Sequence, residues 1–357
     1  MNKLAWVLLA LIGTVVVVGS WFLLKMPERE VDGGDVGTPI SNPEATTGKQ
    51  VYHLDVDGAR REFIVYRPDN VPTTEELPVV FMFHGGGQNG EIFYRGSGWT
   101  NKADEEGLMV VFPTALKYHV YSDSKVKNGE VMNNVAEYAT RWSGAKIETR
   151  FDPEYPDQTT HDDFAFVDAM VNFLGENYAV DTNRFYATGF SNGGGFVNNL
   201  MVRSTDTFAA FASNASGGFS VGELYTEDGG KPGDFVARPS IVLIGSLDPK
   251  LTYMSGVILG EEISEFATDE SAADEDNAVR VRYIDPYLDI LGLTDSYTYE
   301  HQGRISHFTF ADSASSSSAA ELNLYVVEGM QHIYPNGNNF PFDVADLYWD
   351  FFEQYSL

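Results

Sequence analysis

A serine enclosed by glycines is the feature of this sequence with the clearest chemical meaning. Ser191 is the centre of GFSNG, residues 189–193, which matches the pattern G-x-S-x-G. The apolar run RFYATGF leads into it, and GGFVNNLMVR, a segment that can begin a helix, follows it. We therefore expect Ser191 at a sharp strand-to-helix turn that exposes its hydroxyl, with glycine neighbours that let the two elements pass closely. The alternative is a plain glycine turn in which the serine has no chemical role.

A nucleophilic serine requires two partners. Its hydroxyl reacts poorly at neutral pH, so a base must take its proton and an acid must orient that base. Asp248 follows the apolar run SIVLIG by three residues, and His332 follows the next such run, LNLYVVEG, late in the chain. Serine, acid and histidine in this order, each after a strand, is the arrangement expected when the serine lies at such a turn. The sequence predicts Ser191, Asp248 and His332 as a catalytic triad.

Other residues fit the two partner roles less well. His307, in the alternating segment GRISHFTF, is the rival base, since it could lie on one face of a strand. The remaining histidines precede Ser191 or, for His301, follow no predicted strand. Asp285 and Asp289 are weaker candidates for the acid because VRYIDPYLDILGL is typical of a helix and not of a loop after a strand.

Acyl transfer also needs backbone N–H groups that stabilise the negative charge on the carbonyl oxygen. The segment FHGGGQNG places three glycines directly after an apolar run, where the backbone can approach a substrate. We predict the N–H groups of Gly86 and Asn192 as the two donors of this oxyanion hole. His84 is expected to hold the loop by hydrogen bonds. The glycine patterns that bind phosphate are not matched in this loop.

Buried strands alternating with helices are predicted to position these groups. Continuous apolar runs, which suit strands covered on both faces, occur at Val79–Phe83, Gly107–Pro113, Arg184–Phe190, Pro239–Ser246 and Leu322–Gly329. Residues 162–178 and 342–357 have helical spacing of apolar side chains, and Asp162 or Asp163 could cap the first helix. Residues 52–68 read as a β-hairpin around VDGAR. The pattern predicts an α/β fold with a mostly parallel sheet flanked by helices.

Composition excludes several classes of function. The chain has 357 residues and a formal net charge of −29, which disfavours nucleic acid as a partner. It has no cysteine, so thiolate nucleophiles, disulfides and cysteine-bound metals are excluded. The acidic segment 260–277 lacks the ligand spacing of a calcium loop, and it and the serine-rich segment 311–320 are expected to be surface loops. We predict no cofactor and no metal, and the oligomeric state does not follow from the sequence.

The N-terminal region differs from the rest. Residues 4–24 carry no charge, and a helix of that length would cover about 30 Å, the thickness of a bilayer core. Residues 1–26 are therefore predicted to be a signal anchor or a cleaved signal peptide, which would make the protein secreted, periplasmic or extracellular. Residues 27–49 read as a flexible linker and residues 50–357 as one catalytic domain, with membrane contact only through the N-terminal segment.

Several segments together resemble the polyhydroxybutyrate depolymerase and feruloyl esterase-like family of α/β-hydrolases. They are LPVVFMFHGGGQNG, VDTNRFYATGFSNGG, DTFAAFASNASG, PSIVLIGSLDP and VEGMQHIYP. The resemblance extends from Val51 to the C-terminus and is most specific in the second of these segments. It implies an α/β-hydrolase fold with the nucleophile at Ser191, the acid at Asp248 and the base at His332. It also implies a small or polymeric ester as substrate: feruloyl or other aryl esters, short-chain esters, or polyhydroxyalkanoates.

Two positions depart from the family pattern. Ile244 stands where the family usually has a histidine before the acid, and Tyr334 stands where it has a tryptophan after the base. Trp142 and Tyr334 are candidates for a wall on which an acyl group or sugar stacks, although Trp142 could equally be part of the core. The sequence predicts a serine carboxylesterase. A serine peptidase of the same fold and a catalytically silent cell-surface binding domain remain the alternatives.

Overall fold

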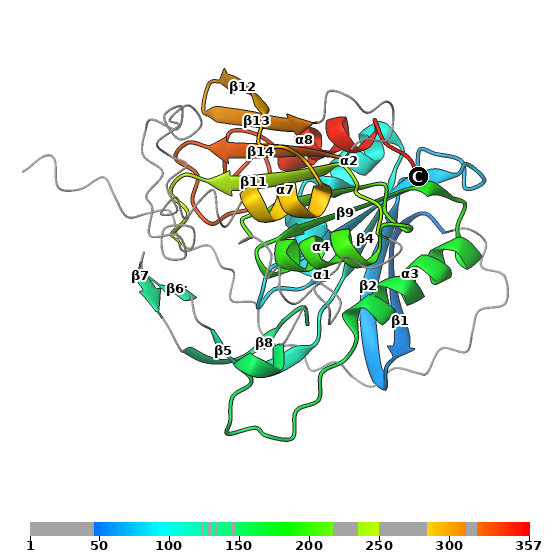
Figure 1. Ribbon diagram of the computed structural model, residues 1–357. Coiled ribbons are helices and arrows are strands. Elements are labelled where there is room, and N and C mark those ends of the chain that lie inside the picture. Colours follow the sequence, from blue (N-terminus) through cyan, green and yellow to red (C-terminus); the bar gives the residue numbers. More distant parts are fainter. Residues whose placement is uncertain are drawn as a thin grey trace, which may run out of the picture. The chain divides into compact units, whose positions relative to one another are not determined.

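The structure is a computed structural model that describes residues 46–122, 125–127, 130–132, 135–143, 147–216, 235–249, 284–311 and 320–357. The described residues form one ten-stranded sheet, in the spatial order β1-β2-β4-β3-β9-β10-β11-β14-β13-β12 (Figure 1). Its strands are β1 Gly48–Val56, β2 Ala59–Arg67, β3 Leu77–Phe83, β4 Met109–Pro113, β9 Val180–Phe190, β10 Ala210–Asn214, β11 Ser240–Gly245, β12 Tyr297–Gln302, β13 Ile305–Ala311 and β14 Glu321–Val327.

The centre of the sheet is parallel and its margins are antiparallel. Strands β4, β3, β9, β10, β11 and β14 pair in parallel, one after the other. β1 pairs with β2 through a turn in which Asp57 and Gly58 both have positive φ, the geometry that matches the twist of a hairpin. β13 and β12 extend the far edge in antiparallel pairing.

The predicted parallel α/β class is correct: the described residues form one large, mostly parallel sheet flanked by helices. The five apolar runs identified in the sequence correspond to β3, β4, β9, β11 and β14. Strand β10 was not predicted, because AFASN is short and contains polar residues, yet all five of its residues are buried between β9 and β11.

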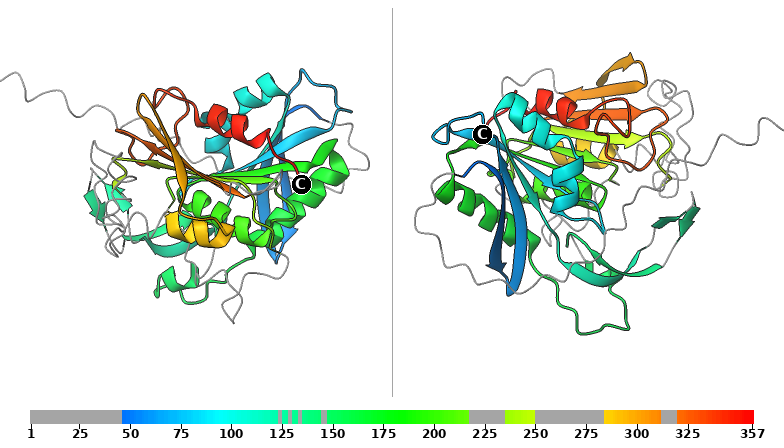
Figure 2. Two further views of the ribbon diagram at one scale, coloured as in Figure 1. Left: turned by 45° about the horizontal axis from the view of Figure 1, so that its top comes forward. Right: turned by 180° about the vertical axis from the view of Figure 1, so that it is seen from behind.

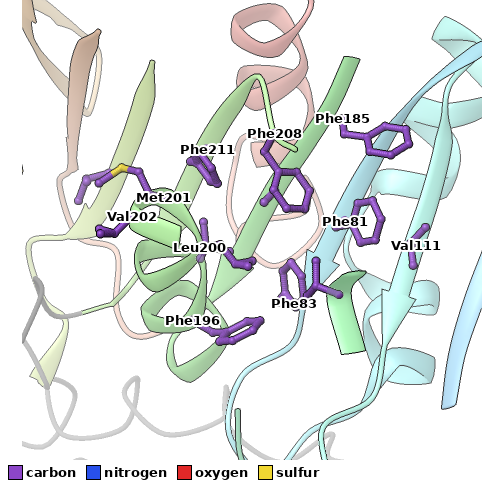
Figure 3. Close-up of a cluster of buried hydrophobic side chains, with 14 of the residues drawn as sticks. Phe81, Phe83, Val111, Phe185, Phe196, Leu200, Met201, Val202, Phe208 and Phe211 are labelled. Carbon is purple, nitrogen blue, oxygen red and sulfur yellow. The ribbon is translucent and has the colours of Figure 1, made fainter. Parts of the chain in front are cut away.

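Helices cover both faces of the sheet (Figure 2). Helices α3 Asp163–Asn177, α4 Asn192–Arg203 and α7 Asp285–Leu291 contribute side chains to the larger apolar cluster. Helices α1 Gly90–Gly96, α2 Trp99–Glu106 and α8 Val344–Phe352 contribute to a second cluster on the opposite face. Figure 3 shows part of the first cluster, in which Phe196 and Leu200 of α4 lie against Phe81 and Phe83 of β3. Burial of these side chains fixes α4 over the centre of the sheet.

Both predicted helices begin at an aspartate cap. Asp162 Oδ1 accepts the N–H groups of Phe164 and Ala165 at the start of α3, so Asp162 is the cap. Asp343 accepts the N–H of Ala345 at the start of α8. The segment with Asp285 and Asp289 forms helix α7, as expected.

A separate antiparallel ribbon of β5 Lys117–Ser122 and β8 Val135–Thr140 follows β4. Strands β6 Lys125–Lys127 and β7 Glu130–Met132 form a two-stranded pair between them in the chain. A 3₁₀ helix, η1 Ile147–Arg150, follows β8. The end of β8 leads to residues that contact the candidate site.

Several predicted segments lie outside the described residues: the apolar segment 4–24, most of the linker 27–49, the acidic segment 260–277 and residues 312–319. β1 begins at Gly48, so its first two residues fall within the range for which a linker was predicted. Among the helices formed by the described residues, none has the length and apolar character needed to span a membrane.

A buried ion pair connects β2 to the start of α3. Arg61 and Asp163 are each 1% exposed, and the Arg61 guanidinium donates to Asp163 Oδ1. The guanidinium also lies 4.1 Å from the centre of the Phe166 ring. Because both charges are removed from water, each depends on the other for compensation.

We expect Arg61→Met to lower the free energy of unfolding by about 3–5 kcal/mol, since it leaves the Asp163 carboxylate buried and without its cation. Urea unfolding of the full-length chain measures this. The neighbouring Arg60→Met, at an exposed position of the same strand, is the control and should change stability by less than about 0.5 kcal/mol. Equal effects of the two variants would contradict the structural importance of the pair.

Candidate active site

Ser191 lies in a strained turn between β9 and α4. Its φ and ψ are 53° and −116°, a conformation that residues with a side chain rarely adopt. The serine N–H donates to Asn214 O at 2.8 Å, which ties the turn to the end of β10. The side chain makes no capping bond to the helix, so the hydroxyl is left for another partner.

The glycines around Ser191 are required by close contacts of the backbone. A Cβ atom on Gly189 would lie 2.4 Å from Gly193 O. One on Gly193 would lie 2.2 Å from Phe83 O and 2.5 Å from His84 O, at the end of β3. Neither position has room for a methyl group, because the obstructing atoms are backbone. The motif therefore lets the first turn of α4 lie directly on the ends of β9 and β3, as the sequence predicted.

The structure brings the three predicted triad residues together. His332 Nε2 is 2.9 Å from Ser191 Oγ, and His332 Nδ1 is 2.7 Å from Asp248 Oδ2. A carboxylate only accepts, so His332 donates its Nδ1 proton to Asp248 and its Nε2 accepts the serine hydroxyl proton. Asp248 is 3% exposed, and the His332 side chain retains 16% exposure. The imidazole can therefore act as a base while its far nitrogen remains fixed.

Contacts between two neighbouring loops place the acid beside the histidine. β11 and β14 are parallel neighbours, so the loops that follow them leave the sheet at the same edge. Leu247 N–H donates to Met330 O at 2.9 Å, and Gly329 N–H donates to Ser246 Oγ at 2.9 Å. A Cβ atom on Gly245 would lie 2.2 Å from Met330 O, so only glycine allows the loops to approach this closely.

The glycine loop after β3 lies on the other side of the serine turn. Gly86 and Gly87 are exposed, and Gly87 has a φ of +76°, which favours glycine. Among the hydrogen bonds of the described residues, none is donated by the backbone N–H of Gly86 or of Asn192. Asn192 is the first residue of α4, where backbone N–H groups have no partner within the helix. Both amides can therefore serve as the predicted oxyanion donors.

His84 holds the glycine loop in place, as expected. Its Nδ1 donates to Gly85 O at 2.8 Å and its Nε2 accepts the N–H of Ala115 at 3.0 Å, so the ring is in one neutral tautomer. The side chain is fully buried, and this burial lowers its pKa to about 4, with a smaller contribution from the Arg141 charge. A protonated ring would lose the bond from Ala115.

The prediction that Trp142 and Tyr334 form a substrate wall is wrong. Trp142 is 2% exposed, stacks on Phe196 with ring centres 5.2 Å apart and donates Nε1–H to His84 O at 2.9 Å. Tyr334 is 7% exposed, and its hydroxyl accepts Trp99 Nε1–H at 2.9 Å. Both rings are almost completely buried, so neither presents a surface to a ligand.

The rival residues have other partners. His307 lies on β13, where its Nε2 is 2.6 Å from Asn323 Oδ1 and its ring stacks on Tyr325. Asp285 and Asp289 belong to helix α7 and not to the loop after β11 that carries Asp248.

Ile244, which stands where the family usually has a histidine, is 2% exposed and belongs to the apolar cluster to which α4 and α7 contribute.

Two groups at the site were not identified in the sequence. The Phe190 ring lies 5.0 Å from the His332 ring, beside the face of the imidazole. Arg141 follows β8 and lies against Gly86, where an added Cβ atom would be 2.6 Å from its Nη1. Burial lowers the pKa of the Arg141 guanidinium, and the charge of Glu137, which pairs with it, opposes that effect. Phe190 adjoins Ser191 in the motif and could have been inferred, whereas Arg141 depends on a ribbon whose pairing the sequence does not reveal.

The His84 pKa predicts a pH dependence of stability. In the folded protein the ring stays neutral down to about pH 4, whereas in the unfolded chain it is protonated below about pH 6.5. Between pH 6.5 and about pH 4 the unfolded chain therefore binds one more proton than the folded protein. The contribution of the neutral His84 ring to the free energy of unfolding is complete above pH 6.5 and is lost as the pH falls towards 4.

We expect the wild type to lose about 2 kcal/mol more unfolding free energy between pH 7.5 and pH 5 than His84→Asn, which has no titrating ring. Urea unfolding of both proteins at the two pH values measures the difference. Parallel pH dependence of the two proteins would show that the His84 ring does not stay neutral in the fold.

Comparison with known proteins gives relatives of one chemical kind. The chain is 24% identical over 341 residues to a poly(3-hydroxybutyrate) depolymerase of Ralstonia pickettii, covering 87% of this chain and 62% of that protein. It is 25% identical over 154 residues to feruloyl esterase B of Thermothelomyces thermophilus, covering 42% of each. It is 26% identical over 155 residues to a bifunctional acetylxylan esterase/xylanase of Neocallimastix patriciarum, covering 43% of this chain and 18% of that protein. The resemblance predicted from the motifs is confirmed by these homologues.

The chain spans less than two thirds of the length of each of these relatives. No family model matches the chain. Among solved structures, an S-formylglutathione hydrolase of Agrobacterium tumefaciens aligns with 88% of this chain and 98% of its own, at 15% identity and a TM-score of 0.49.

Proposed function

We propose that the protein is a serine-dependent carboxylic ester hydrolase that acts through an acyl-enzyme. The observation that carries the proposal is the unbroken hydrogen-bonded line from Asp248 through His332 to the Ser191 hydroxyl. Two nearby segments, the glycine loop and the start of α4, carry backbone amides, Gly86 and Asn192, that donate no hydrogen bond among the described residues. The homology to esterases and to a polyester depolymerase supports the same reaction type.

The proposed reaction has two halves. Ser191 Oγ attacks the ester carbonyl while His332 Nε2 takes its proton, and Asp248 stabilises the imidazolium that forms. The carbonyl oxygen, now negative, accepts hydrogen bonds from the N–H groups of Gly86 and Asn192. His332 then gives its proton to the leaving alcohol, and the acyl group remains on Ser191. Water, activated by the same histidine, releases the acid in the second half.

The substrates proposed are neutral esters: feruloyl or other aryl esters, short-chain esters, or polyhydroxyalkanoate polyesters. The net charge of −29 favours a neutral substrate over an anionic one, and it would help to expel the carboxylate product. The names of the three relatives support these ester types without choosing among them. Action outside the cytoplasm is part of the proposal and rests on the apolar character of residues 4–24.

We expect Ser191→Ala to abolish hydrolysis of p-nitrophenyl acetate, a loss of about 10⁶-fold in kcat, because removing the nucleophile of such a triad eliminates the covalent pathway. The thermal unfolding midpoint should change little, since within the described part of the chain the hydroxyl bonds only to His332. A fluorophosphonate should label the wild type at Ser191 and leave the variant unlabelled. Near-normal turnover by the variant, or an unlabelled wild type, would end the assignment.

We also expect His332→Ala to lower kcat by several orders of magnitude and His307→Ala to lower it by less than about twofold. Only the first ring contacts Ser191, whereas the second bonds to Asn323 on the edge of the sheet. Steady-state rates with the same ester separate the two, and a larger loss in His307→Ala would transfer the role of base.

The substrate class is tested with a panel of esters on the full-length chain: p-nitrophenyl acetate, methyl ferulate and a polyhydroxybutyrate film, beside a peptide p-nitroanilide. Highest kcat/KM on any of the three esters supports the proposal. A preference for the anilide would assign a peptidase instead.

A further inference from the structure

Residues Thr140–Ser143, here called the strap, contact both elements of the proposed oxyanion hole. The strap begins at the last residue of β8 and runs between the glycine loop, residues 84–88, and the first residue of α4. These two elements belong to different parts of the chain and carry the two proposed donors, Gly86 and Asn192. Their separation determines whether both amides can reach one oxygen atom.

Three hydrogen bonds join the strap to the glycine loop. Gly87 N–H donates to Thr140 O at 2.9 Å, and Thr140 Oγ1–H donates to Gln88 O at 2.6 Å. Trp142 Nε1–H donates to His84 O at 2.9 Å. A loop with three successive glycines has little side-chain packing of its own, so these bonds, with the one from Ala115 N–H to the His84 ring, restrict its backbone.

A fourth hydrogen bond joins the strap to the other donor residue. Trp142 N–H donates to Asn192 Oδ1 at 2.8 Å. Asn192 therefore has two separate functions: its backbone N–H faces the proposed oxyanion, and its side-chain oxygen holds the strap. Trp142 bonds to His84 through its indole and to Asn192 through its backbone, so this single residue connects the two sides of the hole.

The strap is itself anchored in the core. Ser143 donates both its N–H and its hydroxyl to Asp163 Oδ2, at 2.5 and 2.7 Å. Asp163 is paired with the buried Arg61 through its other oxygen. Beneath the strap, the Trp142 ring lies on Phe196 and edge-on to Phe83. The strap therefore has a fixed position from which to hold the glycine loop and the first residue of α4.

We infer that the strap sets the geometry of the oxyanion hole, and that Trp142 and the Asn192 side chain are positioning residues for the proposed hydrolysis. The inference rests on the proposed function. Its physical basis is that donors accelerate acyl transfer only when they are held in place before the charge develops. A displacement of about 1 Å at such a site is sufficient to lower the rate by about 100-fold.

Trp142→Phe tests the inference directly. It retains an aromatic ring against Phe196 and Phe83 and removes the indole N–H that bonds to His84 O, together with part of the ring volume. We expect kcat for p-nitrophenyl acetate to fall by about 10- to 100-fold with KM changed by less than about twofold, because the loss concerns the charge formed in the transition state. The affinity for a boronic acid, which forms a tetrahedral adduct on the serine, should fall by a similar factor.

Trp99→Phe is the matched control. Trp99 is also fully buried and also donates its indole N–H, to the Tyr334 hydroxyl at 2.9 Å, but among the described residues it has no bond to the glycine loop or to Asn192. We expect both variants to lose similar thermal stability and only Trp142→Phe to lose kcat. A purely structural role of Trp142 would give the two variants the same kinetics, which would overturn the inference.

A second variant, Asn192→Ala, removes the bond on the other side of the strap and keeps the backbone N–H. We expect a loss of kcat comparable to that of Trp142→Phe. The double variant should lose less transition-state stabilisation than the two single variants add up to, since both substitutions loosen the same connected unit. Hydrogen–deuterium exchange of residues 84–88 should accelerate in Trp142→Phe and Asn192→Ala but not in Trp99→Phe. Unchanged exchange in the first two would overturn the inference without reference to catalysis.

The proposed hydrolase function and the role of the strap are overturned by different results. A wild type that hydrolyses no ester in the panel and resists fluorophosphonate ends the proposed function. An active wild type whose Trp142→Phe variant keeps its kcat leaves the proposed function intact and overturns only the role of the strap.

Discussion

The contact on which the site depends is the one between the first turn of α4 and the ends of β3 and β9. Gly193 lies against Phe83 O and His84 O so closely that no side chain fits, and Gly189 lies as closely against Gly193. This contact holds Ser191 in its strained conformation and brings the start of α4 beside the glycine loop. The cost of the strain is of order 1–3 kcal/mol, which the large buried core around Phe196 and Leu200 can offset.

The remaining groups reach the serine because parallel strands end at one edge of the sheet. Asp248 and His332 follow two neighbouring strands, and bonds between the two loops leave little freedom in their relative position. The nucleophile turn and the acid–base pair are thus assembled from separate, rigid parts. The glycine loop has little side-chain packing of its own. The His84 ring holds it through bonds to Gly85 O and to the N–H of Ala115, and the Trp142 indole N–H donates to His84 O.

Sequence reasoning was reliable where the signal is local and weak where it depends on pairing. Continuous apolar runs identify strands buried on both faces, and the order of Ser191, Asp248 and His332 follows from which loops come after them. Strand β10 and the β5–β8 ribbon were not predicted, because short strands with polar residues are recognised only by their partners. Trp142 and Tyr334 were misassigned for a related reason: an aromatic residue near a catalytic motif can face the substrate or the core, and only the packing decides.

Two buried titratable groups beside the site, His84 and Asp163, have hydrogen bonds or an opposite charge that match them. His84 remains neutral because each ring nitrogen has one suitable partner, and protonation would break one of those bonds. Asp163 lies in the core with Arg61 paired to one carboxylate oxygen and Ser143 donating to the other. The same carboxylate thereby connects the stability of the domain to the position of the strap. If the strap sets the oxyanion geometry, then substitutions at this ion pair, which touches neither Ser191 nor His332, will affect the transition state as well as the fold.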